Sequence, residues 1–70
     1  MKYVGIKQVL KAVKEETVEK VYIGEDAEKH VLDELLKTCE DNNITVIKVK
    51  TMAELGKMAG IDIGAAAAAE

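Results

Sequence analysis

Two kinds of hydrophobic spacing alternate along this chain, and the alternation limits the folds open to it. Each short β-rich run is followed by a segment in which apolar residues recur at helical spacing. In chain order the sequence predicts a strand over residues 3–4, a helix over 6–15, a strand over 18–24, a helix over 27–41, a strand over 44–49 and a short helix over 52–59. Strands separated by helices place the helices on both faces of a sheet. The predicted fold class is therefore α/β, a three-layer α/β/α sandwich around a small mixed sheet.

The length of the chain allows one domain with one modest core. A domain of 70 residues buries only about 60% of the surface that its unfolded chain exposes. Residues 1–70 are therefore interpreted as a single domain, too small to enclose a large cavity. We expect one contiguous core, formed by Ile6, Val9, Leu10, Val13, Val21, Ile23, Leu32, Leu35, Leu36, Val46, Ile47, Val49 and Leu55.

Turn and capping residues mark the ends of the predicted elements. Gly5 joins the first strand to the first helix. Glu25 and Asp26 are expected to cap the second helix and to place acids in its first turn. Thr51 is expected to cap the short third helix, and Gly60 is expected to end it.

The alanine stretch at residues 65–69 admits two interpretations. Alanine is the best helix former, so propensity favours a helix. Small side chains also suit a strand that lies close beneath packed helices, and Ile61-Asp62-Ile63 just upstream alternates as a strand does. The residues alone therefore leave both helix and strand open.

Charge is distributed unevenly along the chain. The four lysines at positions 2, 7, 11 and 14 are the only charged side chains in the first fourteen residues, whereas residues 15–41 hold ten acids against three lysines. The whole chain has a formal net charge of −3, so a positive end precedes a negative middle. Within the positive end, Gly5 is expected to open a helix that carries Lys7, Gln8 and Lys11. Two ammonium groups and an amide at a helix start suit contact with a phosphate backbone and a base edge.

Residues suited to catalysis or metal binding are few. Cys39 is the only cysteine and His30 the only histidine, so the sequence offers neither a disulfide framework nor a set of zinc ligands. No nucleophile lies near a base, and no phosphate-binding loop is present. We therefore expect a protein that is not an enzyme, with no catalytic residues, metal or cofactor, and with a buried thiol at Cys39. Low cysteine content, together with no secretory signal and no membrane span, favours a cytoplasmic protein.

Four segments resemble those of one known superfamily in their order and separations. They are Gly5-Ile-Lys-Gln-Val-Leu-Lys11, Gly24-Glu-Asp-Ala27, Leu55-Gly-Lys-Met-Ala-Gly60 and Ile61-Asp-Ile-Gly-Ala-Ala66. Together they resemble the kink-turn-binding large-subunit ribosomal proteins of the L7Ae and L30e superfamily, over nearly the whole chain. The short bacterial members are most similar, because they have Lys-Gln where the archaeal and eukaryotic members have Asn-Glu. The resemblance implies that the alanine tail is a strand.

The resemblance also implies an RNA-binding site in two parts. The turn and helix start, with Gly5, Lys7, Gln8 and Lys11, correspond to the segment that enters the major groove of a kink-turn at its tandem sheared G·A pairs. A kinked RNA with such pairs opens a groove that is too narrow in a regular RNA helix. The second part corresponds to the loop that covers the protruding nucleotide, and consists of Ile61, Asp62, Ile63 and Gly64.

The sequence departs from the superfamily pattern in three respects. The helix that usually precedes the first strand is missing, so we expect a thinner outer layer. Gln8 stands where the best-studied branch has glutamate, so its hydrogen bonding to guanine is expected to differ. Asp62 lies in the loop expected to face RNA, where an acid repels phosphates, although the superfamily tolerates an acid there. The chain also stops at Glu70, where the last strand usually continues with more aliphatic residues.

Two functions are compatible with these observations. The first is an RNA-binding protein, ribosomal-protein-like and monomeric, that stabilises a kink-turn in ribosomal RNA, a riboswitch or a messenger leader. Neither DNA nor a membrane is an expected partner, whereas the ribosome is one. The alternative is a regulatory protein-interaction module of the same superfamily without RNA binding, whose acidic middle meets a basic partner. If Lys2, Lys7, Lys11 and Lys14 gather on one face with the 61–64 loop, RNA is favoured, whereas scattered lysines would count against it.

Overall fold

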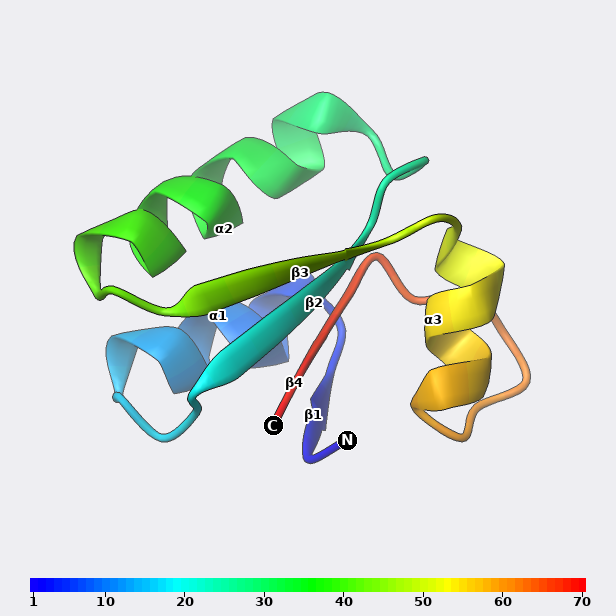
Figure 1. Ribbon diagram of the computed structural model, residues 1–70, viewed down its shortest axis with the longest axis horizontal. Coiled ribbons are helices and arrows are strands. Elements are labelled where there is room, and N and C mark those ends of the chain that lie inside the picture. Colours follow the sequence, from blue (N-terminus) through cyan, green and yellow to red (C-terminus); the bar gives the residue numbers. More distant parts are fainter.

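The computed structural model describes residues 1–70 as a four-stranded mixed sheet with three helices (Figure 1). The elements are β1 (Tyr3–Val4), α1 (Ile6–Lys14), β2 (Lys20–Gly24), α2 (Lys29–Asp41), β3 (Thr45–Val49), α3 (Met52–Met58) and β4 (Ala67–Ala69). The strand order is β1-β4-β2-β3; β2 and β3 are parallel, and β4 is antiparallel to both of its neighbours. The alternation of helices and strands predicted from the sequence is confirmed, and the alanine tail is a strand.

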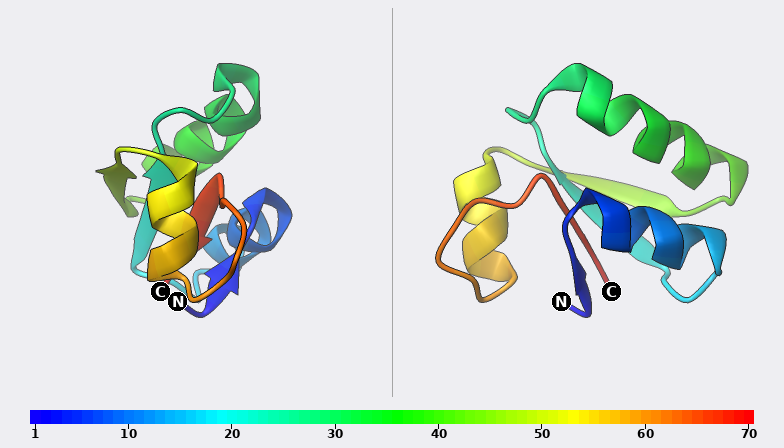
Figure 2. Two further views of the ribbon diagram at one scale, coloured as in Figure 1. Left: turned by 90° about the vertical axis from the view of Figure 1, so that its right-hand side faces the viewer. Right: turned by 180° about the vertical axis from the view of Figure 1, so that it is seen from behind.

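The helices lie on both faces of this sheet, which confirms the predicted α/β/α arrangement. Figure 2 shows α1 and α2 on one side of the strands and α3 on the other. β4 pairs with β1 on one edge and with β2 on the other, and its alanines contribute to both core clusters, so it is covered on both faces. Its three alanines are fully buried. Their small side chains let the helices approach the sheet closely, as expected for this tail.

The hydrophobic core is divided in two, and the expectation of one contiguous core was wrong. The larger cluster contains buried side chains of α1 and α2, and the smaller one contains Leu55 of α3. Side chains along a strand point alternately to opposite faces, so the sheet separates the clusters. Ala67 and Ala69 belong to the larger cluster and Ala68 to the smaller one. Ile47, which was expected in the core, is only partly buried and belongs to neither.

All three helices end in the same hydrogen-bonded motif. In α1 the backbone N–H of Thr17 donates to the Ala12 oxygen and that of Glu16 donates to the Val13 oxygen, both at 3.0 Å. These two bonds define a Schellman motif, in which the first residue after the C-cap adopts a left-handed conformation. That residue is Glu16 in α1, Asn43 in α2 and Gly60 in α3, with φ angles of 58°, 56° and 78°. Gly60 therefore ends α3 as predicted.

Glu16→Gly is expected to stabilise the fold by about 1 kcal/mol. A left-handed conformation places the Cβ of Glu16 close to a backbone oxygen, which costs about 1–2 kcal/mol. Glycine removes this cost, but part of the gain in stability is offset because glycine is more flexible in the unfolded chain. The measurement is the urea midpoint at an unchanged slope. Asn43→Gly is the matched control with a smaller expected gain, since asparagine tolerates this conformation better. An unchanged or lowered midpoint for Glu16→Gly would contradict the expectation.

Asp26 caps a different helix from the one predicted. The residue before α2 is Glu28, which makes no side-chain capping hydrogen bond. Instead, the Asp26 Oδ1 atom accepts a hydrogen bond of 2.8 Å from the backbone N–H of Met52, at the start of α3. The prediction that Glu25 and Asp26 cap α2 was wrong because α2 begins later, at Lys29, and the turn after β2 directs Asp26 to another element. The Thr51 cap is confirmed by a 3.1 Å bond from Glu54 N–H.

Candidate nucleic-acid interface

The turn at Gly5 fixes where α1 begins. Gly5 has φ 99° and ψ 151°, a conformation that only glycine adopts readily. Its backbone N–H donates to the Ala67 oxygen at 2.9 Å, and its own oxygen accepts from Val9 at 3.0 Å. The start of α1 is thereby bonded to β4, three residues after Gly64. The Gly5 turn is thus held by the strand that follows the 61–64 loop in the chain.

The outer face of α1 is basic and free of acids in its first turn. Val9 and Val13 are fully buried, whereas Lys7, Gln8 and Lys11 are exposed. The one close contact between an acidic and a basic side chain joins Glu28 and His30 at 3.3 Å, so no lysine of α1 has a carboxylate partner. These cations remain available to an anionic ligand.

The loop of residues 61–64 is attached to α3 at both ends. The backbone N–H of Ile61 donates to the Gly56 oxygen and that of Ala65 donates to the Met52 oxygen, each at 3.0 Å. The side chain of Ile61 packs against the smaller core cluster, while Asp62 and Gly64 are exposed. Ile63 is 73% exposed, the larger value of the two large exposed hydrophobic residues in the chain.

Two glycines allow this loop to lie against α3. A Cβ atom at Gly56 would lie 2.0 Å from the backbone oxygen of Ile63, and one at Gly64 would lie 3.2 Å from the Cβ of Met52. Gly56 is buried within α3, so the loop backbone crosses the helix where the helix has no side chain. The position of Ile63 therefore depends on Gly56.

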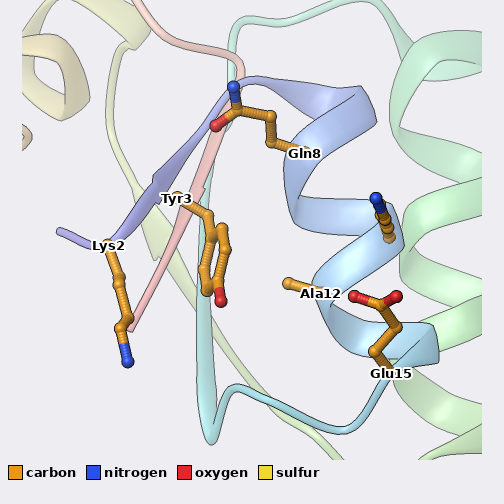
Figure 3. Close-up of a pocket in the computed structure, with 6 residues that line it drawn as sticks. Lys2, Tyr3, Gln8, Ala12 and Glu15 are labelled. Atoms are coloured by element: carbon orange, nitrogen blue, oxygen red, sulfur yellow. The ribbon is translucent and has the colours of Figure 1, made fainter.

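A hollow of about 380 Å³ separates β1 from α1 (Figure 3). It contains Gln8 and Lys11, which were predicted site residues, together with three residues that the sequence did not assign to a site: Tyr3, Ala12 and Glu15. Lys2, known from the sequence only as part of the positive end, completes the lining. A signal for Tyr3 was present, because the short strand that contains this aromatic residue leads through the Gly5 turn directly into α1.

The predicted site residues are thus brought together only in part. Gln8 and Lys11 share the hollow, and Gly5 lies beside β4. Lys7 is exposed on α1 but does not line the hollow. The loop with Ile63 follows α3, on the other face of the sheet from α1. Of the four lysines of the positive end, the hollow unites two.

Other titratable groups offer no second site. Burial raises the pKa of the Cys39 thiol, which keeps it protonated at neutral pH. The Tyr22 hydroxyl donates a 2.6 Å hydrogen bond to Glu70 Oε1, and this bond, with desolvation, raises the pKa of Tyr22. No cluster of three or more His, Cys, Asp or Glu side chains has an arrangement that could hold a metal ion. None of the helices has the length and apolar character needed to cross a membrane.

Comparison with known proteins gives consistent matches. Residues 3–70 match the family described as the ribosomal protein L7Ae/L30e/S12e/Gadd45 family. An RNA-binding protein of Caldanaerobacter subterraneus subsp. tengcongensis is 51% identical over 67 residues, which cover 96% of this chain and 82% of the relative. An RNA-binding protein of Geobacillus sp. is 39% identical over 66 residues, 94% of this chain and 80% of the relative.

A solved structure has the same fold. The Giardia lamblia 15.5kD RNA binding protein superposes with a TM-score of 0.87 at 24% sequence identity. The superposition covers 94% of this chain and 56% of that protein, so this chain spans a little more than half of its length. At this identity the likeness concerns the fold alone.

Proposed function

Because this chain belongs to the ribosomal protein L7Ae/L30e/S12e/Gadd45 family, we propose that it is an RNA-binding protein that recognises a kink-turn. The family indicated by the four sequence motifs is confirmed, and bacterial relatives described as RNA-binding proteins support the first half of the proposal. The names of those relatives mention neither a kink-turn nor the residues that read it, so these two parts of the proposal go further than the relatives do. No bond-breaking chemistry is part of the proposed function.

The observation that carries the proposal is the acid-free start of α1. Gly5 sets the position of the helix, and Lys7, Gln8 and Lys11 are exposed in its first two turns without an ion-pair partner. Ammonium groups and backbone N–H groups at a helix start attract phosphate oxygens. The Gln8 amide can both donate to and accept from a purine edge. This segment can therefore hold a backbone and read a base.

The 61–64 loop supports a second contact in the same complex. Ile63 exposes an apolar side chain to solvent, and the loop backbone is fixed on α3. An extruded base offers a flat, largely apolar face that such a side chain can cover. We assign Ile61 to anchoring the loop and Ile63 to covering the base. Asp62 adds negative charge to the loop, which favours contact with a base over contact with a phosphate.

The proposal is tested with two RNA duplexes that differ only at the kink. One contains the kink-turn with its tandem G·A pairs, and the other has Watson–Crick pairs in their place. We expect tight binding to the first and weak binding to the second, whether the kink-turn is taken from ribosomal RNA, a riboswitch or a messenger leader. Equal affinity for both duplexes would refute kink-turn recognition and leave general RNA binding.

Gln8→Ala is expected to lower the affinity for the kink-turn duplex by on the order of 1–3 kcal/mol, because a base-edge hydrogen bond is lost. The preference over the Watson–Crick duplex should fall with it. Gln8 is exposed, so the free energy of unfolding should change by less than about 0.5 kcal/mol. Isothermal titration with both duplexes measures the change. Parent-like binding of both RNAs would show that the reading residue lies elsewhere.

Lys11→Ala is expected to weaken binding of both duplexes by about the same factor, because a phosphate contact carries no sequence information. The slope of log affinity against log salt should become shallower by about one unit. For the parent we expect a shallow slope, equivalent to roughly two to four neutralised phosphates, since few lysines face the RNA. A loss confined to the kink-turn duplex would instead make Lys11 a reading residue.

A further inference from the structure

The hollow between β1 and α1 has walls of different chemistry. Tyr3 comes from β1, an edge strand that pairs only with β4, and its ring packs partly against the larger core cluster. In Figure 3 the ring faces Ala12 and Glu15 across the hollow, with Gln8 near one end and Lys2 toward the other. The Tyr3 hydroxyl makes no hydrogen bond within the chain.

The size of the hollow suits one small flat ligand. Its volume of about 380 Å³ lies near the lower end of the roughly 300–1,000 Å³ that small-molecule sites occupy. Gln8 and Ala12 of α1 and Glu15 at the C-cap of this helix follow one strip, and a helical rise over seven residues is roughly 10 Å. That length fits a single nucleotide between the strip and the Tyr3 ring.

The charges around the hollow also fit a nucleotide within a chain. An aromatic ring provides a surface on which any base can stack. Lys2 lies just before β1 and Lys11 lies on α1, so each can contact one of the two phosphates that flank the base. The Glu15 carboxylate repels a further phosphate but accepts hydrogen bonds from a ribose hydroxyl or a base amino group.

Gln8 and Lys11 connect this hollow to the proposed kink-turn interface, since both belong to each. We infer that the hollow is a subsite for one unpaired RNA nucleotide adjacent to the kink-turn. Its base stacks on Tyr3, and Lys2 and Lys11 hold its flanking phosphates. This subsite rests on the proposed function and extends the bound RNA beyond the G·A pairs.

The test compares kink-turn RNAs with and without one unpaired nucleotide, added in turn at each strand end. In the parent protein we expect at least one extension to tighten binding by roughly 5- to 150-fold, the range for stacking of a base on an aromatic residue. Tyr3→Leu should lose this gain but bind the blunt kink-turn as the parent does, whereas Tyr3→Phe should retain the gain. Extensions that add nothing for the parent, or a gain that survives Tyr3→Leu, would overturn the subsite.

Tyrosine fluorescence gives an independent readout of stacking. The chain has no tryptophan and only two tyrosines, so Tyr3 is the sole strong emitter in the Tyr22→Phe variant. The favourable extension should quench this emission, and the same RNA with an abasic extension should not. An abasic RNA that quenches equally would overturn stacking, and a free nucleoside monophosphate that binds and quenches as strongly would assign the hollow to mononucleotides.

The two proposals fail in distinguishable ways. If kink-turn recognition is wrong, the blunt kink-turn duplex and its Watson–Crick counterpart bind equally. If only the subsite is wrong, that preference persists while every extended RNA binds like the blunt one. Lys2→Ala serves as a further check, because it should reduce the gain from the extension and leave the preference for G·A pairs unchanged.

Discussion

Gly56→Ala is expected to lower the free energy of unfolding by about 3 kcal/mol, near the upper end for overpacking a buried site. The new Cβ atom would lie 2.0 Å from the oxygen and 3.0 Å from the carbonyl carbon of Ile63, and backbone atoms cannot rotate away as a side chain can. The loop must therefore move. Helix propensity acts in the opposite direction, since alanine is favoured over glycine by about 1 kcal/mol within a helix. The sign of the change thus tests whether the loop lies on α3.

The displaced loop should also bind RNA less well. Movement of Ile63 strains the bond from Ala65 N–H to the Met52 oxygen, and it shifts the side chain proposed to cover the extruded base. Urea denaturation and titration with the kink-turn duplex measure the two effects. Ile63→Asp is the control: because Ile63 is 73% exposed, RNA binding should weaken without loss of stability. A Gly56→Ala variant as stable as the parent would contradict the described seating of the loop.

Leu35→Ala is expected to lower the free energy of unfolding by about 2–5 kcal/mol. Leu35 is fully buried in the larger cluster between α2 and the sheet, so truncation removes apolar burial and leaves a cavity. A domain of 70 residues has a total stability of roughly 3.5–10 kcal/mol, at about 0.05–0.15 kcal/mol per residue. The substitution therefore removes a large part of the stability. If the total stability of the parent is near the lower end of this range, a substantial fraction of the Leu35→Ala variant is unfolded.

Leu36→Ala is the matched control for this measurement. Leu36 is the next residue in the same helix but only partly buried, so its loss should cost markedly less. Cys39 supplies a second readout, because its thiol is fully buried and its pKa is raised by burial. A thiol reagent should modify Cys39 mainly after unfolding, and faster in Leu35→Ala than in Leu36→Ala. An equal decrease in the free energy of unfolding for the two variants would contradict the described packing of α2 on the sheet, in which Leu35 faces the core.

Much of the fold was accessible from the sequence because its signals are local. The apolar stripe of α2, with Leu32, Leu35 and Cys39, repeats at helical spacing within thirteen residues. Gly60 ends α3 and Thr51 caps it through bonds that span only a few residues. Such features need no knowledge of distant segments, and the structure agrees with each of them.

The structure of the alanine tail and the role of Asp26 could not be predicted from neighbouring residues in the sequence. For residues 65–69, helix propensity and strand packing compete, and the choice came from the family resemblance. The physical reason for a strand is its place between β1 and β2, which supply hydrogen-bond partners that an isolated segment lacks. Asp26 precedes a helix and so resembles its cap, but its partner is Met52, 26 residues further along the chain.

Some features of the candidate site also follow from the sequence, whereas others depend on the tertiary structure. The sequence by itself determined which side chains α1 exposes, and the resemblance assigned Gln8 and Lys11 to RNA, an assignment that stays a prediction. Only the tertiary structure decided that Tyr3 stands opposite Ala12 and that the loop crosses α3 at Gly56. Periodicity specifies which face of an element is buried, whereas neighbours across a gap are set by how whole elements pack. A hollow or a close backbone approach therefore becomes visible only once the chain has folded.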